Sequence, residues 1–224
     1  MSNQQDPASH PADPATDKAN DAASAEGKVL STPTNSLSPS LAPIATRHPL
    51  QNRWSMWYNS CSKDAWEPRH IASMTTVEEF WCLYNNLLPP SRIPLGNYHF
   101  FKNGIEPTWE DAANQKGGKW WFELPKSESA LMDDLWLWTL LALIGEYFET
   151  SEDINGAVVS PRARVTKLAL WTTCNDEARM RKIGQAWREA LRIGGEFFYL
   201  PHNPDSSQFP GGKVPKYLYK EPQY

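Results

Sequence analysis

Two tryptophans in predicted loops could bind a flat ring between them. Trp66 lies in the stretch KDAWEP and Trp109 in GIEPTWED, and each is followed by a glutamate with a proline close by. Pro107 and the pair Gly117-Gly118 favour irregular backbone around the second tryptophan. An indole offers a large flat face on which a base can stack. We therefore expect the two indoles to enclose a planar ring; the alternative is that each fills an apolar rim.

Glu110 could supply the hydrogen bonds of such a site. An ionised carboxylate accepts hydrogen bonds through both oxygens and donates none. The Watson–Crick edge of guanine presents N1–H and the N2 amino group as adjacent donors, whereas adenine lacks that pair. A carboxylate beside a stacking platform therefore predicts selection of guanine, and the alternative is a solvated acid in a surface loop.

A short basic cluster follows, formed by Arg162, Arg164 and Lys167 in a predicted strand hairpin. Side chains 162 and 164 share a face if the segment is extended, and Lys167 lies just beyond them. Converging cations suit a short polyphosphate, although basic residues on an exposed hairpin are also common. Together these features predict a site for a guanine-like, phosphate-bearing ligand. A cationic ring such as N7-methylguanine would gain about 0.5–2 kcal/mol from cation–π attraction, beyond stacking of about 1–3 kcal/mol.

The composition limits how the chain could hold such a ligand. Its 224 residues carry a formal net charge of −4, so general neutralisation of phosphates cannot be its main mode of binding. The 11 tryptophans, 8 phenylalanines and 8 tyrosines instead favour stacking and a large aromatic core. Binding of nucleic acid would have to be local.

The cysteines and the apolar stretches indicate the compartment. Cys61, Cys82 and Cys174 form no C-x-x-C pair and no disulfide framework, which predicts a reducing compartment, the cytoplasm or the nucleus. The first residues have no apolar run typical of a signal peptide. The longest apolar stretch, around 135–144, is too short to span a bilayer. Neither a cofactor nor a metal is expected.

The elements that must position these residues begin after a long polar segment. Residues 1–46 contain no aromatic residue and are rich in Ala, Ser, Pro, Asp and Thr, so we predict a disordered N-terminal tail. The domain would then span 47–224, with a flexible loop at 202–215. We expect strands at 52–59, 97–102, 118–124 and 195–200, a hairpin within 156–173 turning at 161–166, and an edge strand at 216–219.

Three amphipathic segments predict helices. The first begins at Thr75 or Thr76 and ends before Pro89-Pro90, and the others span 127–148 and 175–193. Helices among antiparallel strands indicate an α+β domain. Because each helix has one apolar stripe, the helices should cover one face of a single sheet and leave the opposite face for a ligand.

Seven segments resemble, in order and at nearly the same spacing, the eukaryotic translation initiation factor 4E family, whose members bind the messenger RNA cap. The resemblance covers 48 to about 193 and implies a curved antiparallel sheet of about eight strands with three helices on its convex face, like a cupped hand. The segments are HPLQNRW (48–54), TVEEFWCLYNNL (76–87), FKNGIEPTWED (101–111), GGKW (117–120), LLALIGE (140–146), GAVVSPRARVTKLALWTT (156–173) and IGQAWREAL (183–191).

The resemblance also implies a role for each candidate residue. Trp66 and Trp109 would sandwich 7-methylguanine, Glu110 would accept hydrogen bonds from the base edge, and Trp171 would lie beside the N7-methyl group. Arg162 and Lys167 would contact the triphosphate of the capped mRNA, with Arg164 assisting. The other tryptophans, such as Trp54, Trp120, Trp121 and Trp136, would be mainly core residues.

A second surface is implied on the convex, dorsal side. In the family this surface binds a helix with a Tyr-x-x-x-x-Leu-Φ motif, carried by the scaffold factor 4G or by 4E-binding proteins. This chain has Trp138 where the family usually has an acid, which enlarges the apolar surface and predicts a partner with a divergent motif or extra hydrophobic contacts. The matching residues are His48, Pro49, Val77, Trp81, Leu137, Trp138 and Leu141.

The sequence favours a binding module over an enzyme, because it contains no nucleophile elbow, glutamate-rich hydrolase box or metal-binding cluster. Three alternatives stay open: a cap-binding repressor of translation, a cap-hydrolysing enzyme and an aromatic-lined carbohydrate binder. The loop before Trp66 and the region after 193 differ from the family, which leaves open a preference for caps with extra methyl groups.

Overall fold

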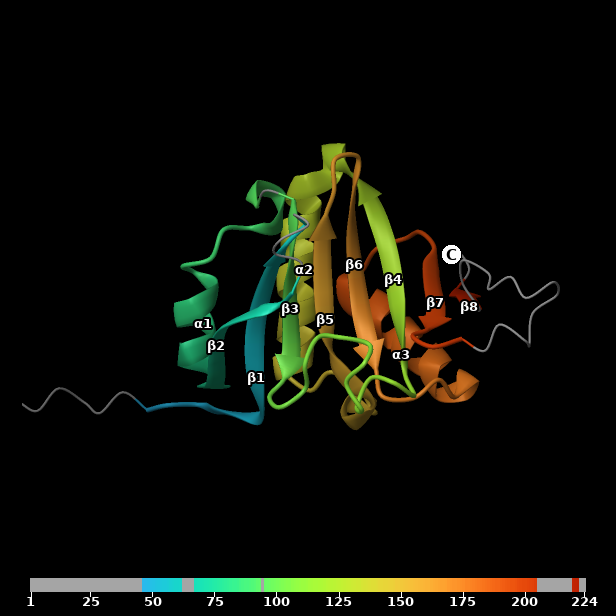
Figure 1. Cartoon of the computed structure of the whole chain (residues 1–224), viewed down its shortest axis with the longest axis horizontal. Coiled ribbons are helices and arrows are strands. Elements are labelled where there is room, and N and C mark those ends of the chain that lie inside the picture. Colours follow the sequence, from blue (N-terminus) through green and yellow to red (C-terminus); the bar gives the residue numbers. More distant parts are fainter. Residues whose placement is uncertain (1–45, 62–66, 94, 205–218, 222–224) are drawn as a thin grey trace, which may run out of the picture. The chain divides into compact units, whose positions relative to one another are not determined.

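The computed structural model describes residues 46–61, 67–93 and 95–204, and the backbone of 219–221. Trp66 and nearly all of the predicted tail lie outside the described residues, as does most of the predicted 202–215 loop. The described chain forms one sheet backed by helices (Figure 1). The predicted α+β class is therefore confirmed.

The sheet has eight strands in the order β2-β1-β3-β5-β6-β4-β7-β8, and every neighbouring pair is antiparallel. The strands are β1 (Pro49–Ser60), β2 (Arg69–Thr76), β3 (Gly96–Lys102), β4 (Gly118–Pro125), β5 (Ile154–Pro161), β6 (Val165–Thr172), β7 (Phe197–Pro201) and β8 (Tyr219–Glu221). The helices are α1 (Val77–Tyr84), α2 (Ser129–Ile144) and α3 (Glu177–Leu191), with short 3-10 turns at Pro90–Arg92, Lys126–Glu128 and Ser151–Asp153.

Capping residues fix where the helices begin. The Thr76 hydroxyl accepts a hydrogen bond from the Glu79 amide, while the Glu79 carboxylate accepts one from the Thr75 amide at 2.7 Å. This reciprocal arrangement satisfies two amides at the start of α1. Asp176 caps α3 in the same way by accepting from the Arg179 amide. The predicted starts of both helices are thus correct to within a residue or two.

Successive side chains along each strand point alternately into the core and toward the opposite face of the sheet. Trp54 of β1 faces the helices and stacks on Phe100 of β3, with 4.8 Å between ring centroids. Trp120 and Trp136 join the same core and are no more than 1 % exposed. Trp121 differs: it is buried, yet it points away from this core. We call the face that carries Trp121 the open face, because all three helices lie behind the other face (Figure 1).

The structure adds one strand that the sequence analysis did not predict and decides one condition that it left open. The sequence pattern does not predict β2, which the structure places at the edge of the sheet next to β1. Arg162 and Arg164 do not lie in an extended segment, because β5 ends at Pro161 and β6 begins at Val165. A hydrogen bond from the Arg162 amide to the Val165 carbonyl, 2.8 Å long, closes the turn between them.

Candidate functional site

The loop between β3 and β4 carries Trp109 and Glu110 and is held by buried hydrogen bonds. The Asn114 side chain is fully buried, and its amide nitrogen donates to the carbonyls of Glu106 and Thr108 at 2.9 and 2.7 Å. Its side-chain oxygen accepts from Asn155 of β5 at 2.9 Å. Because the side-chain bonds of Asn114 replace regular backbone pairing, the loop is rigid although it is irregular. The backbone that carries Trp109 is thus held in place, while the Trp109 side chain is 54 % exposed.

An aromatic cavity of about 160 Å³ lies under this loop on the open face. It brings together three predicted residues, Trp109, Glu110 and Trp171, which come from the loop and from β6. The position of Trp66 relative to them is outside the described residues. We call this space the aromatic cavity; its lining residues are Asn59, Pro68, His99, Pro107, Thr108, Trp109, Glu110 and Trp171.

A second cavity of about 500 Å³ adjoins the first, because Trp171 lines both. It contains two of the predicted cations, Arg162 and Lys167. Arg164 lies at the exposed turn and is not among its lining residues. We call this space the basic cavity; its lining residues are Asn97, Lys119, Trp121, Val158, Ser160, Arg162, Lys167, Ala169, Trp171 and Leu200.

The Lys167 ammonium already has partners on this face. It lies 3.4 Å from a Glu123 carboxylate oxygen and 4.4 Å from the centre of the Trp121 ring. Both contacts are partly exposed and therefore weak. Lys167 can exchange them for a ligand phosphate at little cost.

Lys119 is a third cation of the basic cavity that the sequence analysis missed. Lys119 on β4 lies directly opposite Trp171 on β6. Burial is the main cause that lowers the pKa of the Lys119 ammonium, and the charge of Lys167 is the second. His202 packs on Trp171 with 4.0 Å between ring centroids. Burial and the nearby charge of Lys119 lower the pKa of His202 to about 3, so this imidazole is neutral at pH 7. The only sequence signal for Lys119 is the alternation within GKWW, which places it on the same face as Trp121.

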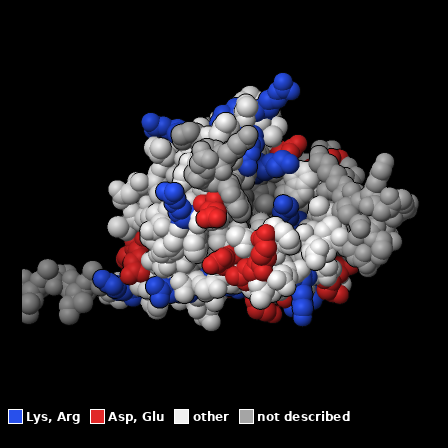
Figure 2. All heavy atoms as spheres, viewed as in Figure 1, with Lys and Arg blue, Asp and Glu red and all other residues white. Residues whose placement is uncertain are grey.

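Charge is distributed unevenly over the open face. Figure 2 shows basic side chains gathered around the β5–β6 turn and acidic side chains over the loop that follows β3. This separation agrees with the basic cavity at one end and Glu110 at the other. The face thus offers cations to one part of a ligand and a carboxylate to another.

The predicted dorsal residues lie on the helical side. The His48 carbonyl accepts from the Val77 amide at 2.9 Å, which joins the start of β1 to the start of α1. The His48 ring nitrogen Nδ1 lies 2.6 Å from the Glu78 carboxylate. This hydrogen bond and, next in size, the one from the His48 backbone amide lower the pKa of Glu78 to about 2. Pro49, the next residue, is exposed. These residues form one end of the candidate partner surface.

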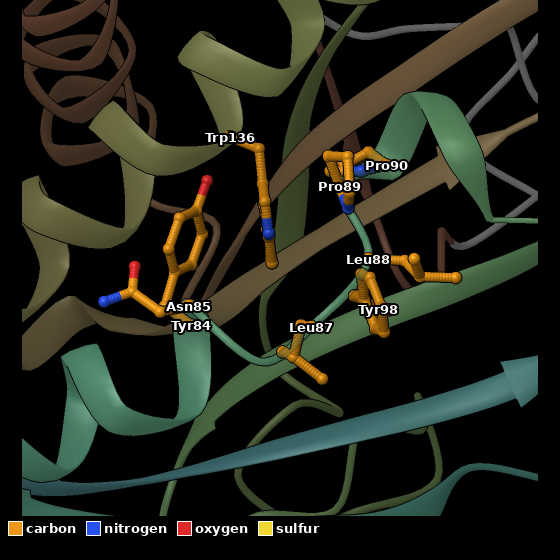
Figure 3. A pocket seen from close by; sticks show the side chains of 8 residues that line it. All are labelled: Tyr84, Asn85, Leu87, Leu88, Pro89, Pro90, Tyr98 and Trp136. Carbon is orange, nitrogen blue, oxygen red and sulfur yellow. The ribbon is translucent and has the colours of Figure 1, made fainter.

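The remaining dorsal residues lie on α1 and α2. Trp81 is half-buried and packs edge-on against Phe80 and Tyr84. Trp138 is 41 % exposed, while Leu137 and Leu141 are half-buried. The end of α1 meets α2 around a cavity of about 230 Å³, where Figure 3 shows the rings of Tyr84 and Trp136 beside the segment Leu87–Pro90.

The fold and these cavities define a class of α+β protein, a curved antiparallel sheet with helices on one face and an aromatic, basic site on the other. The model of the family described as eukaryotic initiation factor 4E matches residues 49–214. The chain therefore belongs to this family, which confirms the resemblance seen in the sequence.

Individual relatives agree in sequence and in structure. The chain is 42 % identical over 187 residues to eukaryotic translation initiation factor isoform 4E of Arachis hypogaea, covering 79 % of this chain and 91 % of the relative. It is similar to Ascaris suum eIF4E-3 in complex with m7G cap, with a TM-score of 0.72, 35 % identity, and coverage of 80 % of this chain and 100 % of the other. It is also similar to C. elegans eIF4E-3 in complex with the 4E-binding protein Mextli and a cap analog, with a TM-score of 0.67, 36 % identity, and coverage of 74 % and 98 %.

Proposed function

We propose that this protein binds the 7-methylguanosine 5′ cap of messenger RNA on its open face and recruits a scaffold or repressor protein on its helical side during translation initiation in the cytoplasm. The observation that carries the proposal is that Trp171 lines both cavities. One cavity holds an indole and a carboxylate, and the other holds cations. That order matches a ligand with a base at one end and phosphates at the other.

Each part of the cap has a matching group. The cationic 7-methylguanine ring stacks on Trp109, and Trp66 remains the predicted second plane. Glu110 accepts from N1–H and from the N2 amino group. Arg162, Lys119 and Lys167 face the triphosphate. The chain is similar to Ascaris suum eIF4E-3 in complex with m7G cap, which supports a cap as the ligand.

Replacing Arg162 with alanine tests the phosphate part. Loss of a charge-assisted hydrogen bond costs about 1.5–3 kcal/mol, which weakens binding of 7-methyl-GTP roughly ten- to a hundredfold. Binding of the 7-methylguanosine nucleoside should change little, because it has no phosphate. Isothermal titration with both ligands measures the difference. Equal losses for the two ligands would remove Arg162 from the phosphate site.

The helical side is the proposed site for a partner helix. Trp81 is the anchor, because it is an aromatic residue that keeps part of its ring accessible, and such residues dominate binding at interfaces. Trp138, which is exposed on α2, adds apolar area in place of a charge. The complex of C. elegans eIF4E-3 with Mextli supports a protein partner.

Trp81→Ala should weaken capture of a peptide with the Tyr-x-x-x-x-Leu-Φ motif by at least about 2 kcal/mol, roughly thirtyfold. Retention on 7-methyl-GTP resin should persist, and it serves as the control for folding. Unchanged peptide affinity in a variant that still binds the resin would place the partner elsewhere.

Binding without catalysis is part of the proposal. Within the described residues, no group of three or more His, Cys, Asp or Glu side chains could hold a metal ion. In that same part of the chain, no helix has the length and apolar character needed to cross a membrane. Incubation with capped dinucleotide and magnesium should return the dinucleotide intact; release of nucleotide would favour the hydrolase alternative.

A further inference from the structure

We propose that Asn97, Asn59 and His99 form a hydrogen-bonded network that positions Arg162 for the phosphate chain before the ligand binds. This inference rests on the proposed cap-binding function and assigns a positioning role to three residues that do not themselves need to touch phosphate. The network runs along the open face from the basic cavity, which Asn97 lines, to the aromatic cavity, which Asn59 and His99 line.

Three side-chain hydrogen bonds make up the network. Arg162 Nη2 donates to Asn97 Oδ1 at 2.9 Å. Asn97 Nδ2 donates to Asn59 Oδ1 at 2.8 Å, and His99 Nε2 lies 2.7 Å from that same oxygen. Strand register supports the geometry, because Asn59 of β1 is directly opposite Asn97 of β3.

The direction of every bond follows from Arg162. A guanidinium can only donate, so Asn97 must present its oxygen to Arg162 and its amino group to Asn59. Asn59 must then present its oxygen, and His99 must carry its proton on Nε2. His99 is only 7 % exposed, and burial lowers its pKa to about 4. The neutral Nε2–H tautomer therefore predominates at pH 7, and the network has one hydrogen-bonding arrangement.

The partners of Arg162 orient it without neutralising it. Arg162 Nη1 donates to the Pro161 carbonyl at 2.7 Å and to the Gly96 carbonyl at 3.4 Å. Together with Asn97, all three acceptors are uncharged, and within the described part of the chain Arg162 has no carboxylate partner. Lys167, in contrast, is paired with Glu123. Arg162 thus keeps its full charge for a phosphate and loses little side-chain entropy when the phosphate arrives.

Asn97→Ala tests the network, because it removes the acceptor of Arg162 and leaves the carbonyl acceptors in place. Affinity for 7-methyl-GTP should fall about three- to tenfold, while affinity for 7-methylguanosine should change less than about twofold. In an Arg162→Ala background the same substitution should have no further effect, since the residue that it positions is gone. Asn97→Ser, which shortens the side chain but stays polar, provides a second variant if the alanine protein unfolds.

Asn86→Ala is the matched control. Asn86 is exposed just after α1, and its side chain donates a hydrogen bond to the Cys82 carbonyl of that helix. Full additivity with Arg162→Ala, or equal losses for both ligands, would overturn the positioning role. A different result would contradict the proposed function itself: no binding of 7-methyl-GTP by the unsubstituted protein and by Asn86→Ala.

Discussion

Trp109→Ala should weaken binding of 7-methyl-GTP by about 2–4 kcal/mol, roughly thirty- to a thousandfold in Kd. The loss combines base stacking with the attraction between an electron-rich indole and a cationic ring. Unmethylated GTP should lose less, because its ring is neutral and only the stacking contribution disappears. Titration by tryptophan fluorescence or calorimetry, with both nucleotides, measures the two losses.

The fold should survive this substitution. Trp109 is 54 % exposed, whereas the loop around it depends on the buried Asn114. Tyr147→Ala is a matched control, because Tyr147 is also aromatic and equally exposed but lies just after α2. Circular dichroism should show native spectra for both variants. If Trp109→Ala retains the parent affinity, the aromatic cavity is not the base site.

Glu110→Gln is expected to cost about 2–3 kcal/mol of binding free energy for 7-methyl-GTP. The amide keeps one acceptor but presents an amino group to a base edge that offers only donors, and it also removes a negative charge beside the cationic ring. The adenine edge offers one acceptor and one donor, which suits an amide. The ratio of affinities for 7-methyl-GTP and 7-methyl-ATP should therefore fall sharply, and competition on 7-methyl-GTP resin measures it.

Glu149→Gln controls for the loss of an acid. Glu149 is exposed and lies 3.7 Å from the Lys182 ammonium, and it lines neither the aromatic nor the basic cavity. It should leave the guanine preference unchanged. An unaltered preference in Glu110→Gln would mean that another group reads the base.

The sequence predicts site residues where they are neighbours along the chain. Trp109 and Glu110 are adjacent and lie in a loop that proline and glycine mark clearly, so their site can be inferred without knowing the strand pairing. The helix that begins at Thr76 is recognisable because capping is also local. Trp66 stays a prediction, since it lies outside the described residues.

Features that depend on strand pairing could not be predicted. The edge strand β2 has the sequence RHIASMTT, in which side-chain alternation is weak because its first residues are exposed. The Asn59–Asn97 pair requires the register of β1 against β3. Lys119 directly precedes Trp120 and Trp121 in the sequence. Only the side-chain alternation of β4 shows that Lys119 shares a face with Trp121. The hairpin turn at 161–166 was predicted, but the sequence does not show whether Arg162 and Arg164 share a face within it.

The opposite placement of the two proposed surfaces has a consequence for assembly. The core around Trp54 and Phe100 separates the open face from α1 and α2, so an RNA end and a protein helix need not compete for space. Such an adaptor can tether a protein to an RNA. The bound protein, and any factor attached to it, then has a raised effective concentration near that RNA. The lifetime of such a bridge is set by the weaker of its two contacts, and it lengthens when the bound protein also contacts the RNA.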